Sequence, residues 1–264
     1  MRFYKIWRIS GKSNDCPSDK MPVASSGNLI NMNIIITGAS KGLGRAIAEK
    51  FAARGYDLFL CSRDQQALTA AAQELGQRYP SITIKWKTAD LAEKDQALGF
   101  GRWVLESGAA IDVLVNNAGQ FILGSLYDKD DSVLERLMAV NLYSAYYLTG
   151  VLLPAMMSRK AGHIFNMCSV ASLKAYPYGG AYSISKFALA GFSANLREEM
   201  KPHGIKVTTV YPGAAYTDSW AGSGVDPQRI MEAGDVADMV LAAARLSPQA
   251  TVEEILLRPQ LGDL

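Results

Sequence analysis

The feature that most constrains the fold is an alternation of two kinds of segment after Met32. Short apolar runs rich in β-branched residues alternate with amphipathic stretches of helical period. The predicted strands are 33–37, 57–61, 82–87, 111–116, 162–168, 205–211 and 253–258. The predicted helices are 42–54, 65–78, 92–107, 130–159, 180–201 and 235–246. Continuously apolar strands separated by helices are typical of a parallel sheet covered on both faces. The sequence therefore predicts an α/β protein with a single-domain Rossmann fold, a doubly wound parallel sheet of about seven strands flanked by helices.

The N-terminal segment differs from the rest of the chain. Residues 1–31 mix charged residues with Ser, Asn, Pro and Gly and show no sustained period. We expect them to form a flexible extension, followed by one Rossmann-fold domain over 32–264. Met32 directly precedes the first predicted strand, so a start of translation at Met32, with 1–31 not native, is a hypothesis that the intact mass would test.

Composition argues against several function classes. The chain has 264 residues, a formal net charge of +2 and scattered basic residues, which does not favour nucleic-acid binding. Cys16, Cys61 and Cys168 form no spaced framework, and His163 and His203 lack partners at metal-ligand spacing. No apolar run approaches the ~20 residues of a membrane span, and the N-terminus is a poor signal peptide. We expect a cytoplasmic protein without a metal, a nucleic-acid partner or a membrane partner.

A glycine-rich turn follows the first predicted strand, in the run TGASKGLGRAIAEKF. Gly38, Gly42 and Gly44 fall where the strand turns sharply into a helix, with the spacing G-x-x-x-G-x-G. Glycine allows positive φ and close backbone approach, and a helix N-terminus attracts phosphate. The turn predicts a nucleotide site, and the alternative is a tight turn without a ligand.

The second predicted strand ends in Ser62 and Arg63, with no carboxylate at positions 61–63. In nucleotide-binding folds a carboxylate near this point binds the ribose 2′-hydroxyl, whereas arginine accommodates a 2′-phosphate. Lys41 adds a second cation at the same end of the sheet. This pattern favours NADP(H) over NAD(H), and the alternative is two solvated surface cations. Asp90-Leu91 and 116–119 follow the third and fourth strands on the ligand side, although turn chemistry alone could explain the second of these.

Three residues then suggest chemistry. Ser169 ends the fifth predicted strand, and Tyr182 and Lys186 lie four residues apart on a predicted helix, so they share one face. A nearby cation favours the phenolate, which would lower the tyrosine pKa and let Tyr182 exchange a proton. The alternatives are a core tyrosine and a surface lysine. Tyr176 and Tyr178 have no lysine four residues further on, so they are candidates for the pocket wall.

Together these motifs resemble the short-chain dehydrogenase/reductase family over residues 32–258. The family's TGxxxGxG, NNAG and YxxxK motifs stand at 37–44, 116–119 and 182–186, with its PG turn at Pro212-Gly213. The resemblance implies a catalytic set of Asn141, Ser169, Tyr182 and Lys186. The cofactor-binding positions that it implies are Gly38, Ser40, Lys41, Gly42, Leu43, Gly44, Ser62, Arg63, Asp90, Leu91, Asn117, Ala118, Gly119, Tyr182, Lys186, Pro212, Gly213 and Thr217.

The resemblance also implies roles. Tyr182 would be the general acid in reduction and the base in oxidation, and Lys186 would bind the nicotinamide ribose and depress the tyrosine pKa. Ser169 would hold the substrate carbonyl, and Asn141 would help position a water in a proton relay. Asn141 could also be a satisfied polar residue within a helix.

Substrate contacts are expected from the loops 120–123, 170–178 and 214–225. They carry Phe121, Leu123, Tyr176, Tyr178, Tyr216 and Trp220. Such a neighbourhood suits an apolar or ring-bearing carbonyl compound or alcohol, and plain loop packing is the alternative. The C-terminal run VEEILLRPQLGDL lacks the ending usual in the family's ketoacyl reductases and resembles more the small pterin- or carbonyl-reducing members such as sepiapterin reductase. The predicted helices 130–159 and 180–201 are apolar on more than one face, which fits a homodimer or homotetramer but also a buried monomeric core.

The sequence thus predicts an NADP(H)-dependent oxidoreductase that interconverts a carbonyl and an alcohol, most simply a ketone or aldehyde reductase. Two alternatives stay open. One is an NAD-dependent alcohol dehydrogenase running oxidatively. The other is a non-catalytic dinucleotide-sensing protein on the same fold.

Overall fold

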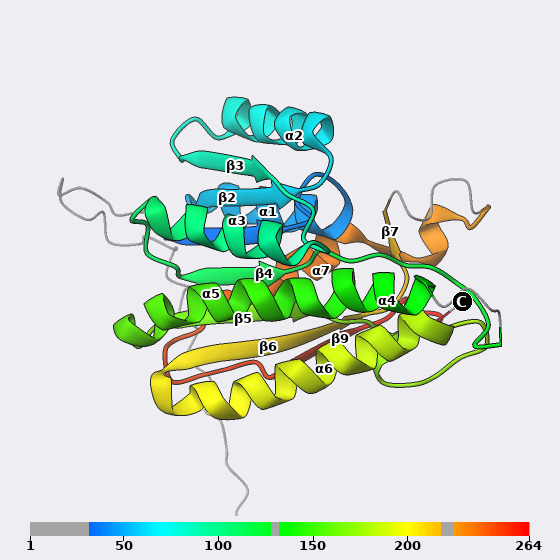
Figure 1. Ribbon diagram of the computed structural model, residues 1–264. Helices are drawn as coiled ribbons and strands as arrows, with labels where there is room; N and C mark the ends of the chain where they lie inside the picture. Colours follow the sequence, from blue (N-terminus) through cyan, green and yellow to red (C-terminus); the bar gives the residue numbers. More distant parts are fainter. Residues whose placement is uncertain (1–31, 128–131, 218–223, 264) are drawn as a thin grey trace, which may run out of the picture. The chain divides into compact units, whose positions relative to one another are not determined.

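The computed structural model describes residues 32–127, 132–217 and 224–263. Seven strands form one parallel sheet in the order β3-β2-β1-β4-β5-β6-β9 (Figure 1). They are β1 (Asn33–Thr37), β2 (Asp57–Ser62), β3 (Ile84–Thr88), β4 (Val113–Asn116), β5 (Gly162–Met167), β6 (Ile205–Pro212) and β9 (Glu254–Leu257). The predicted doubly wound sheet is confirmed, because the strand order reverses between β1 and β4. The expected extension at 1–31 lies outside the described residues.

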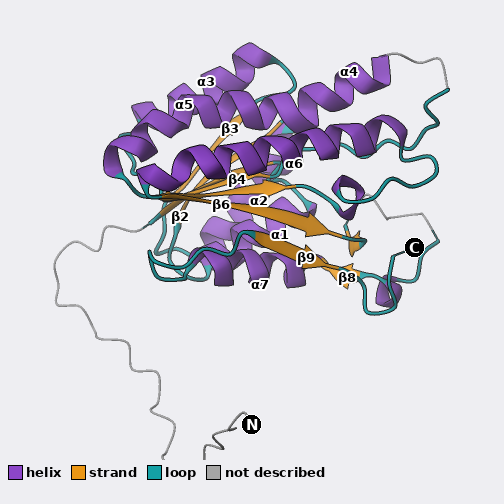
Figure 2. Ribbon diagram, turned by 90° about the horizontal axis from the view of Figure 1, so that it is seen from below, coloured by secondary structure: helices purple, strands orange, loops and turns teal. Residues whose placement is uncertain are grey.

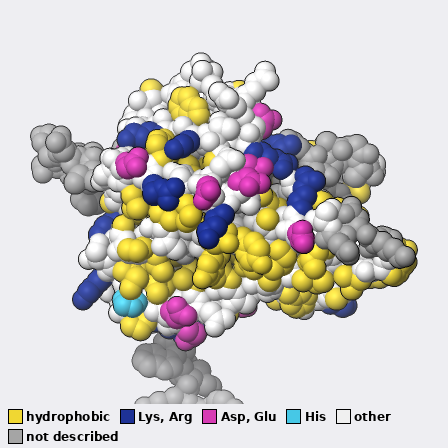
Figure 3. Space-filling model, in the orientation of Figure 1, with side chains coloured by type: hydrophobic (Ala, Val, Ile, Leu, Met, Phe, Trp, Pro, Cys, Tyr) yellow, Lys and Arg dark blue, Asp and Glu magenta, His cyan; other side chains and the backbone are white. Residues whose placement is uncertain are grey.

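Helices cover both faces of the sheet. Figure 2 shows α3, α5 and α6 on one face and α1, α2 and α7 on the other. Their bounds are α1 (Gly42–Ala52), α2 (Gln65–Arg78), α3 (Lys94–Glu106), α4 (Ser132–Met138), α5 (Ser144–Arg159), α6 (Gly180–Met200) and α7 (Ala233–Ala244). Figure 3 shows hydrophobic side chains exposed over α5 and α6. Tyr146 of α5 and Phe187 of α6 are about half exposed.

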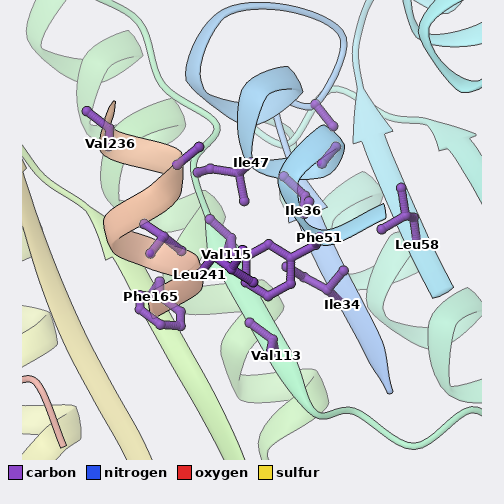
Figure 4. Close-up of a cluster of buried hydrophobic side chains, with 14 of the residues drawn as sticks. Ile34, Ile36, Ile47, Phe51, Leu58, Val113, Val115, Phe165, Val236 and Leu241 are labelled. Atoms are coloured by element: carbon purple, nitrogen blue, oxygen red, sulfur yellow. The ribbon is translucent and has the colours of Figure 1, made fainter. Parts of the chain in front are cut away.

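The core is divided by the sheet into two layers. Side chains alternate across a strand, so Ile34 and Ile36 of β1 pack under α1 and α7, while Ile35 packs under the opposite helices. Figure 4 shows the first layer, where the ring of Phe51 from α1 lies among the isoleucines of β1. Both layers are buried, which is why the central strands β1, β2 and β4 are nearly continuous apolar runs. The edge strands β3 and β9 are largely exposed. This packing fixes the strand ends that carry the site.

The predicted helix 130–159 differs from the structure in one respect. A π-helical segment, Ala139–Tyr143, separates α4 from α5, and the predicted start at 130 lies in the undescribed residues 128–131. A π-turn has no distinct apolar period over five residues, so the sequence pattern could not reveal it. Such insertions often occur at functional sites, and this one contains Asn141.

By length and composition alone, the stretch Ser132–Arg159 could cross a membrane. Core helices of other proteins pass the same test. Here Leu148, Leu152 and Met156 of α5 are fully buried in the core layer that also contains α3 residues.

A second, two-stranded sheet of β7 (Ala215–Tyr216) and β8 (Met231–Glu232) was not predicted, because two-residue strands carry no periodic signal.

Candidate active site

A cleft of about 770 Å³ lies at the carboxyl ends of the parallel strands, where ligands bind in such sheets. Most of the residues predicted as catalytic or cofactor-binding line it. These are Gly38, Ser40, Lys41, Gly42, Leu43, Ser62, Arg63, Asp90, Leu91, Asn117, Ala118, Gly119, Ser169, Tyr182, Lys186, Pro212, Gly213 and Thr217. The remaining two, Gly44 and Asn141, do not line the cleft. They contact residues that do, since Gly44 packs against Gly38 and Asn141 accepts a hydrogen bond from Gln120.

The glycine turn is built for close approach. Gly38 and Gly42 have φ of +65° and +57°, a conformation that side chains rarely adopt. A Cβ on Gly44 would lie only 2.3 Å from the carbonyl oxygen of Gly38, so α1 can begin this near the strand only with glycine there. The amide Nδ2 of Asn117 donates to the carbonyl oxygens of Thr37 (2.9 Å) and Gly38 (3.2 Å) and so fixes the turn.

These contacts leave the start of α1 facing the cleft. The first N–H groups of a helix have no partner within the helix, and its dipole favours an anion there. The backbone cradle therefore fits a pyrophosphate group, as the predicted dinucleotide cofactor would present.

The end of β2 offers hydroxyls and cations. The hydroxyls of Ser40 and Ser62 share a hydrogen bond of 2.9 Å, and Lys41 and Arg63 are exposed at the same end of the cleft. The first carboxylate after β2, that of Asp64, instead accepts from the N–H of Ala67 and caps α2. This end of the cleft is suited to a doubly charged phosphate group.

The predicted catalytic side chains meet at the other end of the cleft. Ser169 lies two residues after the end of β5, while Tyr182 and Lys186 lie in the first two turns of α6. The side chain of Ser169 hydrogen-bonds the phenol of Tyr182. The ammonium of Lys186 is buried, donates to the carbonyl oxygen of Met167 (2.8 Å) and lies 5.9 Å from the centroid of the Tyr182 ring.

The expected lowering of the Tyr182 pKa is not found. Burial raises the pKa of Tyr182 to about 12, and the hydrogen bond from Ser169 only partly offsets this. The physical reason is geometric, because the Lys186 ammonium is directed at a backbone carbonyl rather than at the phenol oxygen. Burial also lowers the pKa of Lys186 itself. In this state the phenol is held in its protonated form.

Asn141 makes structural hydrogen bonds rather than facing the cleft. Its Oδ1 accepts from the N–H of Gln120 (2.7 Å), and its Nδ2 donates to the carbonyl oxygen of Gln120 (3.1 Å) and to Ser185 Oγ (2.8 Å). A Cβ on Gly119 would lie 3.1 Å from Asn141 Oδ1 and 3.5 Å from Lys186 Nζ, so glycine lets these groups approach. The Asn141 side chain thus connects the backbone of Gln120 to Ser185, a contact that the predicted role in a water relay did not include.

The cleft has fewer aromatic lining residues than the predicted substrate loops suggested. Phe121 and Tyr176 line it, whereas Leu123, Tyr178 and Tyr216 are exposed and are not among its lining residues. Trp220 lies outside the described residues.

Two charged residues that sequence reasoning missed also line the cleft, Arg258 and Asp263. Their side chains pair at 2.8 Å beside Gly213. No local sequence motif predicts their position, because the C-terminal residues reach the cleft only through the pairing of β9 with β6. Within the described ranges, no group of three or more His, Cys, Asp or Glu is arranged to hold a metal ion.

Comparison of the sequence and the fold with known proteins identifies the family of this chain. The sequence profile described as short chain dehydrogenase matches residues 32–227. The chain therefore belongs to the short-chain dehydrogenase family of oxidoreductases. Sepiapterin reductase from Chlorobaculum tepidum is 34% identical over 239 residues, which is 88% of this chain and 97% of that protein.

Other relatives and solved structures are similarly close. Dehydrogenase/reductase SDR family member 7B from Bos taurus is 37% identical over 71% of this chain, but the match spans only 59% of its length. A metagenomic short-chain oxidoreductase solved with NADP is 32% identical, with a TM-score of 0.76 over 88% of this chain and 98% of that one. A short-chain dehydrogenase from Sphingobium yanoikuyae solved with NADPH is 29% identical, with a TM-score of 0.75 over 85% and 87%.

Proposed function

We propose that this protein is an NADP(H)-dependent oxidoreductase that interconverts a carbonyl and an alcohol, working as a ketone or aldehyde reductase. The observation that carries the proposal is the placement of Ser169 and Tyr182 at one end of a cleft whose other end is the glycine turn. A phosphate cradle and a proton donor in one cleft are the parts that carbonyl reduction requires.

Each side chain then has a task. A nicotinamide cofactor held in this cleft would supply the hydride in reduction and accept it in oxidation. Tyr182 gives its phenolic proton to the carbonyl oxygen during reduction and takes it back during oxidation, and Ser169 holds that oxygen by a hydrogen bond. Lys186 would bind the ribose of the cofactor through its remaining N–H donors, since one of the three is directed to the carbonyl oxygen of Met167. The Asn141 side chain hydrogen-bonds Gln120 of the cleft wall and Ser185 of α6, and so keeps these two segments together.

The cofactor preference rests on the end of β2. Lys41 and Arg63 would supply two cations, and the hydroxyls of Ser40 and Ser62 would supply hydrogen bonds to a 2′-phosphate, since all four residues line the cleft. A carboxylate that would repel this phosphate is absent from positions 61–63. The relatives solved with NADP and NADPH support the same choice.

We propose a ring-bearing carbonyl compound as the substrate class. Phe121 lies edge-on to the Tyr182 ring, with centroids 4.7 Å apart and planes at 86°, and Tyr176 lines the same end of the cleft. Two aromatic walls beside the proton donor favour a flat apolar group next to the reacting carbonyl. The similarity to sepiapterin reductase, a protein named for a ring-bearing substrate, points in the same direction.

Two copies of the chain are expected to associate through α5 and α6. Tyr146 of α5 and Ile184 and Phe187 of α6 are exposed, as is Tyr143 at the end of the π-helical segment. Figure 3 shows hydrophobic side chains gathered over these two helices. An exposed apolar patch of this kind marks an interaction surface. The patch on these two helices therefore favours a homodimer or homotetramer.

The test is a screen of NADPH consumption at 340 nm with aldehydes, ketones and diketones, repeated with Tyr182→Phe. The wild type should reduce at least one class, and the variant should lose at least about a thousandfold in kcat because no proton donor remains, which corresponds to ~4 kcal/mol. NADPH affinity should change less than about threefold. Activity retained by the variant would contradict the mechanism, and NADPH binding without turnover of any carbonyl would favour a dinucleotide sensor.

A further inference from the structure

The hydroxyl of Ser185 joins two predicted catalytic residues that are far apart in the sequence. Ser185 lies on α6, one residue before Lys186, and its side chain is completely buried. It accepts a hydrogen bond from Asn141 Nδ2 (2.8 Å) and donates one to the carbonyl oxygen of Tyr182 (2.7 Å). Two consecutive hydrogen bonds therefore connect Asn141 of the π-helical segment to the backbone of Tyr182 through the Ser185 hydroxyl.

Asn141 extends this chain to the wall of the cleft. Its side-chain amide makes two hydrogen bonds to the backbone of Gln120: Oδ1 accepts from the N–H, and Nδ2 donates to the carbonyl oxygen. Fixing both polar groups of one peptide residue leaves the next residue, Phe121, little freedom to move. The segment 119–121 is thus tied to α6 through Asn141 and Ser185.

Phe121 completes the connection at the phenol ring. Its ring contacts the Tyr182 ring edge-on, with centroids 4.7 Å apart. Tyr182 is consequently held at two points: Ser185 holds its backbone carbonyl, and Phe121 supports its ring.

We propose that Ser185 is a positioning residue for the reaction, which sets the place of the Tyr182 phenol through its backbone contact and through Asn141, Gln120 and Phe121. This inference rests on the proposed function. Removing the hydroxyl leaves an Asn141 N–H without its acceptor in a buried place, which is unfavourable enough to displace the amide. The ring of Phe121 then loses its support, and a small displacement of a catalytic group costs rate.

The chain offers a matched control on the same helix. Ser193 is also completely buried, and it also accepts from an asparagine amide, Asn166 Nδ2, at 3.0 Å. It lies eight residues beyond Ser185, about 12 Å along the helix, and contacts Thr209 rather than the cleft. Ser193→Ala should therefore reproduce the loss of a buried hydrogen bond without moving Tyr182.

The experiment compares Ser185→Ala, Ser185→Thr and Ser193→Ala for kcat, KM, NADPH affinity and unfolding temperature. Ser185→Ala should lower kcat about tenfold, with NADPH affinity changed less than twofold. Ser193→Ala should keep kcat within twofold although its unfolding temperature also falls. Ser185→Thr keeps the hydroxyl and should recover at least half of kcat.

A second readout does not depend on turnover. The difference in absorbance at 295 nm between each protein and its Tyr182→Phe counterpart gives the ionised fraction of Tyr182 in the cofactor-free state. At pH 10 we expect about 1% ionisation in the wild type and in Ser193→Ala, because burial holds the phenol protonated. Ser185→Ala should exceed 10%, since a displaced ring meets water.

Unchanged kcat and unchanged ionisation in Ser185→Ala would overturn the positioning role, as would equal losses in Ser185→Ala and Ser193→Ala. If the wild type reduces no carbonyl, the proposed function fails. The ionisation of Tyr182 then still decides whether Ser185 positions the phenol.

Discussion

His163 is a buried histidine whose protonation should limit stability in acid. It lies on β5, is 4% exposed, and its Nε2 shares a hydrogen bond of 2.7 Å with Thr208 Oγ1. Its Nδ1 is buried without a hydrogen-bond partner among the described residues. Burial, and secondarily the charge of Lys206, lowers the pKa of His163 to about 3 from the ordinary 6.5.

The sign and size of the effect follow from this difference. Between pH 6.5 and about 3 the unfolded chain binds a proton at His163 and the folded chain does not, so stability falls as the pH falls. Each pH unit in this window costs about 1.36 kcal/mol. Lowering the pH from 7.5 to 5.0 should therefore cost the free energy of unfolding about 2 kcal/mol through this residue.

Urea unfolding at pH 7.5 and pH 5.0 measures the loss. His163→Gln removes the titrating group, so its loss between the two pH values should be about 2 kcal/mol smaller than that of the wild type. His203→Gln, which replaces the other histidine of the chain, serves as the matched control and should behave like the wild type. An equal loss in the wild type and in His163→Gln would refute the reasoning.

Three further predictions concern the site and the assembly. Replacing Arg63 by Ala should raise KM for NADPH at least tenfold and leave KM for NADH within about twofold, because only NADPH carries the 2′-phosphate; equal effects on both cofactors would contradict the assignment. In the cofactor-free protein, a 295 nm titration of the wild type against Tyr182→Phe should place the Tyr182 midpoint above 10, since burial raises its pKa to about 12, and a midpoint below 10 would contradict this. Phe187→Glu should shift the light-scattering mass toward the monomer, because it puts a charge on the exposed apolar surface of α6, while an unchanged mass would exclude that surface as the interface.

The sequence by itself determined the sheet and the location of the cleft. Both follow from short-range patterns: continuously apolar runs predict buried parallel strands, and the glycine spacing predicts a turn that only glycine can form. Since parallel strands end at one edge, Ser169 and the glycine turn were expected to share a cleft, and both line it. The roles given to these residues remain predictions.

Only the tertiary structure decided how the site is supported. Asn141 and Ser185 are 44 residues apart, and their hydrogen bond exists because α6 packs beside the π-helical segment. Likewise, Arg258 enters the cleft only through the pairing of β9 with β6. The raised pKa of Tyr182 has the same origin, because burial and the direction of the Lys186 ammonium are set by packing. Local periodicity carries no information about such long-range contacts, and these contacts decide whether the phenol keeps its proton.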